Sequence, residues 1–316
     1  MLLRPAFLAL ACAAGLTAAD PALLSLIPKD PLMIAGVDVT RAKASPFGQR
    51  ILAEMKDEDK NFRELVESTG FDPRRDLREA ILATDGKTGE NTVILARGSF
   101  DPSKISAFLR AKGAVPSVYN GVELWADGKK ANPDGSIAVV DSSLAIFGKD
   151  AAVRAAVDRR SASGSALSAD LQKRIAEWSV NDAWIITTAP FGELGVNKDG
   201  QNRVMPAGIA PNAIRSAGAG VRFGQDILVS GEALTRSEQD AQALADVFRF
   251  VVSMIRLNAD KPQASEALKV ADSLQLALNG ASLRFSLTVP EETLDKMMQR
   301  KGPAARRARR VAPAAQ

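Results

Sequence analysis

The chain has 316 residues, of which 46% are hydrophobic and 25% are charged, a balance typical of globular proteins with a buried core. It contains no histidine, which excludes a Ser-His-Asp triad, a zinc site with histidine ligands and a haem held by histidine. The only cysteine, Cys12, lies near the start of the chain, so the rest of the sequence has no thiol for catalysis, disulfides or iron–sulfur clusters.

Residues 1–19 have the pattern of a secretory signal peptide. Arg4 precedes an apolar run over residues 6–16, and the small residues Thr17 and Ala19 stand at positions −3 and −1 of a cleavage site. The run is shorter than the roughly 20 apolar residues that a membrane-spanning helix needs. We therefore expect cleavage after Ala19 and a secreted or periplasmic protein.

A lipoprotein signal is the alternative interpretation of the same stretch. In that case Cys12 would carry the lipid. The match is poorer because Ala9 stands where a larger aliphatic residue is usual. We favour simple cleavage, after which the mature chain starts at Asp20.

Strand and helix patterns alternate through the first half of the chain. Apolar or alternating runs predict strands at 31–39, 78–85, 91–98, 117–126, 136–141 and 143–148. Helical spacing with start and stop residues predicts helices at 45–55, 60–69, 101–113 and 150–160. Asn120-Gly121 is a hairpin-turn signal. The Ser/Ala/Gly-rich segment 159–168 is typical of a linker.

The charged stretch GFDPRRDL, residues 70–77, has two interpretations. Asp72 can cap a single helical turn whose first residue is Pro73, and Asp101-Pro102 repeats that arrangement for the next helix. The alternative is an anion site formed by three nearby arginines: Arg74, Arg75 and Arg78. We favour capping, because it accounts for the aspartate and the proline without a ligand.

A similar order of elements returns in the second half. Helices are predicted at 168–178, 235–257, 264–278 and 290–300, and strands within 182–194, 217–234, 276–285 and 281–289. Asn279-Gly280 matches the earlier Asn-Gly turn by position. We take the segment 192–212, rich in Gly, Asn and Pro, as an insertion rather than a loop over a binding face.

Together these patterns predict an α+β fold with mostly antiparallel sheets, helices packed on one face, and two ferredoxin-like repeats. The predicted organisation is a signal peptide at 1–19, a first repeat at 20–160, a second repeat at 161–299 packed against the first, and a disordered basic tail at 300–316.

The basic tail carries the chain's excess of positive charge. Residues 300–316 hold six basic and no acidic residues, which leaves residues 20–299 with about three more acidic than basic side chains. The tail either serves only solubility, which we favour, or binds an anionic envelope surface through four arginines: Arg306, Arg307, Arg309 and Arg310. For an exported protein we expect no nucleic-acid partner.

The helix at 235–257 has the most unusual pattern. Thr235 and Glu238 have the spacing of a capping box. Apolar residues at helical spacing form a core stripe, and three further residues widen it beyond one face: Val247, Phe250 and Met254. We favour a helix packed between the sheet and the helix at 264–278. The alternative is a surface for an apolar ligand or partner.

No motif in the sequence identifies a catalytic, cofactor-binding or metal-binding residue, and we predict no cofactor. The Gly86–Thr88 segment lacks the earlier glycine of a phosphate-binding loop, and residues 197–202 do not fit a calcium loop. The three tryptophans lie on apolar faces, where we expect core packing: Trp125, Trp178 and Trp184. Carboxylates alone could still support a hydrolase.

Several segments resemble uncharacterised secreted bacterial proteins whose family has no assigned activity: LIPKDPLMIAGVDV, GFDPRRDL, ARGSFD and YNGVELW. The resemblance implies the class of protein and its export from the cytoplasm, and it assigns no catalytic residue to this chain. Our first hypothesis is a non-enzymatic secreted or periplasmic binding or structural protein. The alternatives are a hydrolase that uses carboxylates, and a chaperone-like or inhibitory module that uses the apolar helix.

Overall fold

The computed structural model describes residues 19–54, 60–84, 91–128, 135–162, 166–190, 212–258, 264–293 and 296. The strands are β1 Met33–Asp38, β2 Leu77–Thr84, β3 Val93–Gly98, β4 Ala114–Tyr119, β5 Val122–Asp127, β6 Ser136–Val139, β7 Leu144–Gly148, β8 Ala183–Thr187, β9 Ile214–Phe223, β10 Ile227–Thr235, β11 Gln275–Asn279 and β12 Ser282–Val289. The helices are α1 Pro21–Leu24, α2 Val39–Ala44, α3 Pro46–Glu54, α4 Lys60–Thr69, α5 Pro73–Asp76, α6 Pro102–Ala111, α7 Asp150–Arg160, α8 Ala169–Trp178, α9 Glu238–Leu257 and α10 Ala264–Asp272.

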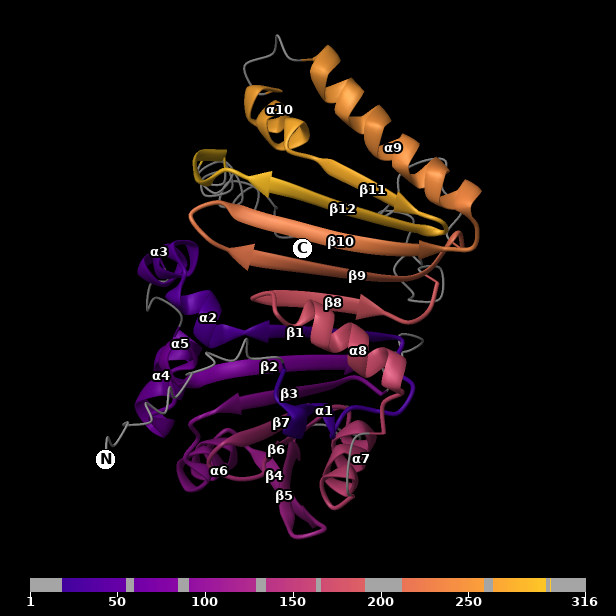
Figure 1. The fold of residues 1–316 in the computed structure, drawn as a ribbon. Helices are drawn as coiled ribbons and strands as arrows, with labels where there is room; N and C mark the ends of the chain where they lie inside the picture. Colours follow the sequence, from indigo (N-terminus) through magenta and orange to yellow (C-terminus); the bar gives the residue numbers. More distant parts are fainter. Residues whose placement is uncertain are drawn as a thin grey trace, which may run out of the picture.

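All of these strands form one sheet, in the order β11-β12-β10-β9-β8-β1-β2-β3-β7-β6-β5-β4, and each neighbouring pair is antiparallel (Figure 1). The first strands of the two halves, β1 and β8, lie side by side at the centre. From that seam β2 and β3 extend one half, and β9 and β10 extend the other in the same order. The predicted α+β class with antiparallel pairing is confirmed, and helices cover both faces of one sheet rather than the single face expected, because the strands carry apolar residues on both faces. The repeat boundaries at 160 and 161 stay a prediction.

Because paired residues in neighbouring strands share a face, the register divides the sheet into two faces. We call the face that carries Ile34, Trp184 and Gly218 the Ile34 face, and the opposite one, which carries Ala96 and Phe285, the Phe285 face. The helices that follow β3 and β10, α6 and α9, both pack on the Phe285 face.

The largest core lies on the Ile34 face of the first half. Ile81, Leu95 and Ile146 on neighbouring strands are fully buried there. They are covered by α1, α7 and α8, which contribute residues such as Leu23 and Val153. Figure 1 shows α8 crossing over β8 and β1. The second half has a smaller core on the Phe285 face, where α9 packs on β10 and β12.

Most local expectations for turns and caps are confirmed. Asp72 accepts a hydrogen bond from the Arg74 amide, and Asp101 accepts one from the Lys104 amide, so both aspartates cap helices. Asn120 has a φ of 46° and begins the β4–β5 turn, a left-handed conformation that asparagine tolerates. The three tryptophans are buried in the folded protein, as expected from their positions on apolar faces.

Two expectations in the second half are wrong. The cap of α9 is Ser237, whose hydroxyl accepts from the Asp240 amide; Thr235 ends β10, and its hydroxyl donates to the Ala281 carbonyl. The helix predicted over 264–278 ends at Asp272, and residues 275–279 pair with β12 as a strand. The apolar run there is short enough to suit either structure, and the pairing partner decides between them.

Candidate functional site

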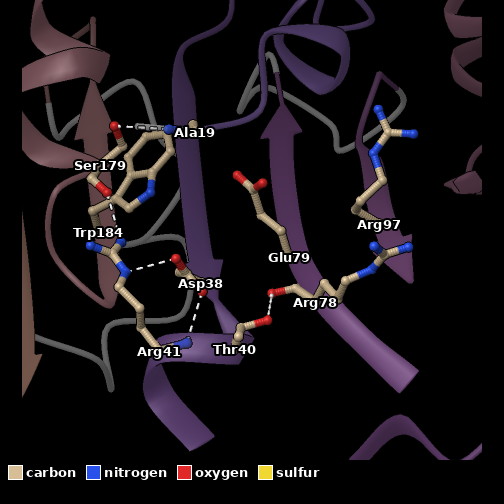
Figure 2. Close-up of a pocket in the computed structure, with 9 residues that line it drawn as sticks. All are labelled: Ala19, Asp38, Thr40, Arg41, Arg78, Glu79, Arg97, Ser179 and Trp184. Atoms are coloured by element: carbon tan, nitrogen blue, oxygen red, sulfur yellow. Dashed lines mark hydrogen bonds and ion pairs between the residues drawn. The ribbon is translucent and has the colours of Figure 1, made fainter. Parts of the chain in front are cut away.

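A pocket with several charged residues in its lining opens on the Ile34 face where β1 ends and α2 begins (Figure 2). Its volume is about 280 Å³. The lining residues come from β1, β2, β3 and β8, from the start of α2 and from two connecting segments: Ala19, Asp38, Thr40, Arg41, Arg78, Glu79, Arg97, Ser179 and Trp184.

Three charged side chains meet in this pocket because the strand register places them there. Asp38 on β1 pairs with Glu79 on β2, and Glu79 pairs with Arg97 on β3. Figure 2 shows Glu79 between the other two. Each continues a strand whose other residues on this face are apolar or glycine, so the charges end the core rather than face open solvent.

The pKa of the Glu79 carboxyl is raised to about 7. Burial is the largest cause, and the nearby Asp20 and Asp38 carboxylates act in the same direction, while the hydrogen bond from the Asp20 amide and the charge of Arg97 act in the opposite direction. The Asp20 amide donates to both carboxylate oxygens, at 3.2 and 3.3 Å. Among the described residues, no lysine or arginine lies within ion-pair distance of Glu79.

Asp20 is held in place by its side chain. Arg97 donates from Nε to Oδ2 of Asp20 at 2.7 Å, and the Ala22 amide donates to Oδ1 at 2.8 Å, so Asp20 also caps α1. Arg97 donates in addition to the Ser143 hydroxyl at 3.2 Å. The chain therefore enters the fold at a fixed point beside Glu79.

On the other side of the pocket, Arg41 joins the two halves of the chain. It donates to Oδ2 of Asp38 at 2.7 Å and to the backbone carbonyls of three consecutive residues after α8: Ser179, Val180 and Asn181. Asp38 accepts from the Arg41 amide as well and caps α2. Because these donors and acceptors are occupied by one another, Asp38 and Arg41 act as a structural clamp.

The three arginines of the predicted anion site bind different partners, and the anion site stays a prediction. Arg74 forms an ion pair with Asp72, and Arg75 forms one with Asp76, each at 2.7 Å. Arg78 donates to the Gly98 carbonyl at 2.6 Å and lines the pocket near Arg97. The four arginines of the tail lie outside the described residues.

The predicted apolar surface on α9 lies at the β11 end of the sheet, away from the pocket. Phe250 and Met254 are 63% and 45% exposed, and Val247 is partly buried. On the neighbouring side of the helix, Leu244 and Phe248 pack on the sheet, with the Phe248 ring 5.3 Å from the Phe285 ring. Both stripes have helical spacing, but only one is covered. We call the exposed residues the α9 stripe: Phe250, Val251, Met254 and Leu257.

Strand β11 is the last strand of the sheet on this side, and it pairs with β12 alone among the described strands. Its residues are largely exposed, including Leu278 at 40%, and α9 contacts it. The α9 stripe and the open edge of β11 therefore lie at the same end of the molecule (Figure 1). In the part of the chain that the structure describes, no helix has the length and apolar character to cross a membrane, and no cluster of acidic or cysteine side chains suits a metal ion.

Sequence reasoning missed the pocket, although a signal for it existed. Glu79 lies two and four residues before Ile81 and Ala83 on β2, and Arg97 lies two residues after Leu95 on β3. Residues at this spacing share a face of the strand, so both charges fall on the buried face. The carboxyl and guanidinium groups at inward positions of adjacent strands indicate a buried polar site.

No protein-family model matches the chain, and no curated protein matches it. Among solved structures, its fold is similar to crystal forms III, I and IV of TP0453, with TM-scores of 0.51, 0.50 and 0.50 and identities of 10%, 10% and 9%. Each match covers 89% of this chain and 97–98% of the TP0453 chain. At such low identity the likeness shows the fold alone. These results agree with the resemblance to proteins that have no assigned activity.

Proposed function

We propose that this protein is an exported, non-enzymatic binding protein that recognises an extended apolar segment of a partner protein. The binding surface is the α9 stripe together with the edge of β11. The observation that carries the proposal is the exposure of four large apolar side chains on one helix beside an open strand edge: Phe250, Val251, Met254 and Leu257 are 63%, 46%, 45% and 79% exposed.

The two edges of the sheet differ in the way that this function requires. At one edge, β4 carries Pro116, which lacks an amide hydrogen and interrupts the row of backbone donors. At the other edge, the β11 sequence QLALN contains neither proline nor a charged residue. An incoming strand can therefore pair with β11 while its side chains contact the α9 stripe, as in β-strand addition.

A peptide partner fits this surface better than a lipid bilayer. The basic side chains on the exposed part of α9 are already paired, Arg249 with Asp246 at 2.7 Å and Arg256 with Asp272 at 2.8 Å, so they present little charge to anionic headgroups. Burying the β11 edge in lipid would also leave its backbone groups without hydrogen-bond partners. In hydrocarbon each such group costs on the order of several kcal/mol.

The proposal is tested by cross-linking followed by a binding measurement. A photoreactive phenylalanine analogue at Val251, with Val118 on the β4 edge as the matched control position, is irradiated in cells that produce the protein. We expect Val251 alone to yield a protein adduct. A purified segment of that protein should bind the wild type at least about tenfold more tightly than Phe250→Ser, a loss of about 1.4 kcal/mol, and Val118→Ser should bind like the wild type.

Three outcomes would overturn the peptide-binding proposal. They are a lipid adduct, an adduct that forms equally from Val118, and a partner whose affinity is unaffected by Phe250→Ser. A chaperone-like module would use the same surface but would yield many unrelated adducts rather than one.

A hydrolase that uses carboxylates is the second candidate, and the raised pKa of Glu79 in the pocket is the observation that favours it. The neighbouring carboxylates are less suited to a second catalytic role, because Asp20 and Asp38 are bound by Arg97 and Arg41. Hydrolysis of aryl glycosides by the wild type that is abolished by Glu79→Gln would establish this candidate. We expect no such activity.

A further inference from the structure

We propose that the α-ammonium group of Asp20, created when the leader is cleaved after Ala19, is the charge partner of Glu79. The nitrogen that donates to Glu79 as a backbone amide would, in the mature protein, carry a positive charge at the same place. This inference rests on the export part of the proposed function and is independent of binding at β11.

The geometry is already that of an ion pair. The Asp20 nitrogen lies 3.2 and 3.3 Å from the two carboxylate oxygens of Glu79. These are hydrogen-bond distances for an amide, and an ammonium group with three hydrogens can serve both oxygens from the same position. Cleavage therefore needs no movement of the chain to bring the two charges together.

Asp20 is held by its own side chain and by the residues that follow it. Its side chain is fixed by Arg97 and by the Ala22 amide, and the segment that follows is anchored by fully or almost fully buried residues: Leu23, Leu26 and Ile27. The nitrogen of Asp20 would stay beside Glu79 after residues 1–19 are removed.

The groups around Glu79 leave the position of the Asp20 nitrogen available for a positive charge. The charged groups that face it are the carboxylates of Asp20 and Asp38 and the guanidinium groups of Arg41, Arg78 and Arg97. Arg97 is bound to Asp20, Arg41 to Asp38, and Arg78 to a carbonyl oxygen. Among the described residues, the hydrogen bonds to the Glu79 carboxylate come from the amide of Asp20 alone.

The structure also fixes the order of events. Ala19 is 5% exposed, and its amide donates to the Ser179 hydroxyl at 3.2 Å. A peptidase cannot reach the Ala19–Asp20 bond in the folded chain, so cleavage has to precede folding. The protein then folds around its new N-terminus, and the space of Ala19 becomes part of the pocket.

The test compares two chains, one that begins at Asp20 and one that begins at Ala19, each as the wild type and as Glu79→Gln. The extra alanine converts the ammonium of Asp20 back to an amide, and it is the matched control. At pH 7 we expect Glu79→Gln to lower the melting temperature of the chain that begins at Asp20 and to raise that of the longer chain. The two shifts should differ by at least about 2–4 °C. Equal shifts would overturn the proposal.

The pH dependence gives a second readout that needs no substitution. In the longer chain the folded state takes up a proton at Glu79 more readily than the unfolded state, so stability should fall as the pH rises from about 4.5 to about 7. In the chain that begins at Asp20, the ammonium keeps Glu79 charged, and stability should instead fall as the pH drops below about 4.5. Identical profiles for the two chains would contradict the inference.

A third measurement follows the amine itself. Its acylation rate at pH 7 should be at least about tenfold slower in the wild type than in Glu79→Gln, since one unit of pKa changes the free-amine fraction tenfold. Equal rates overturn the pairing. Mass spectrometry of the exported protein tests the export proposal separately from the pairing. An N-terminus at Asp20 supports both the export and the pairing. A lipidated Cys12 or a retained leader overturns the pairing in the cell, even where the purified chain that begins at Asp20 shows it.

Discussion

The two halves of the sheet begin at the seam with three strands in the same order, but they are covered differently. Both halves carry a helix on the Phe285 face, α6 in the first and α9 in the second. In the described part of the chain, the second layer of α1, α7 and α8 on the Ile34 face covers the first half and the seam, and α8 extends only to β9 of the second half. In the second half that face carries small and polar residues such as Ser230 and Arg284, and Arg284 forms ion pairs with Glu232 and Glu177.

The difference shows that strand order does not determine where the stability lies. The first half buries its largest aliphatic residues on the Ile34 face. Its helix α6, which corresponds to α9 of the second half, packs on the opposite face. Among the described residues, the second half has one core under α9, and part of that helix stays exposed. Halves that begin with the same strand order therefore differ in their cores, one thick and the other with exposed apolar surface.

The largest expected effect is the loss of a core side chain in the first half. Leu95 is fully buried between β3 and the second layer, so Leu95→Ala should lower the free energy of unfolding by about 2–5 kcal/mol through lost burial and a cavity. Leu228 lies on the same face of the second half and is 38% exposed, so Leu228→Ala should change it by about 0.5 kcal/mol or less. Denaturant unfolding measures both, and equal losses would show that the uncovered face is not open.

The next effect tests how the second layer reaches the second half. A Cβ at Gly218 would lie 2.3 Å from the indole nitrogen of Trp178, which is buried at the end of α8. Gly218→Ala should therefore cost about 1–3 kcal/mol, whereas Ser230→Ala on the same face should cost little. A tolerated alanine at position 218, seen as an unchanged melting temperature, would mean that Trp178 does not hold the two parts together.

The caps of the corresponding helices should contribute equally. Asp101 caps α6 and Ser237 caps α9, each by accepting a backbone amide hydrogen bond. Replacing either one by alanine should lower the free energy of unfolding by about 1 kcal/mol. If an activity is found and Asp101→Ala removes it without a change in stability, the role of Asp101 is not capping.

The smallest effect is a pH dependence confined to the second half. Hydrogen bonds from Lys296 and Thr293, together with charge attraction from Lys269 and Lys296, hold the pKa of Glu266 on α10 down to about 2. Since the folded state releases this proton more readily than the unfolded state, the contribution is present above about pH 4.5 and is lost as the pH falls toward 2. Acid unfolding of Glu266→Gln should lack this component, and a profile identical to that of the wild type would exclude it.

Much of the local structure was predictable because it depends on neighbouring residues. Asp72 and Asp101 precede prolines and bind amides two and three residues away, and Asn120-Gly121 forms a turn within one hairpin. Predictions failed where distant partners decide. The segment after Asp272 is a strand because β12 pairs with it, and Ser237 rather than Thr235 caps α9 because β10 extends through residue 235.

The sequence by itself determined the α+β class, most strands and helices, and the exclusion of chemistry that needs histidine, since these follow from composition and local periodicity. Only the tertiary structure decided which face each helix covers and which charges meet. Asp38, Glu79 and Arg97 lie far apart in the chain, and strand register brings them into one pocket, where hydrogen bonds to Glu79 and Arg97 hold Asp20 beside it. The α9 stripe has the same apolar spacing as a core stripe, and only the position of the sheet leaves it exposed.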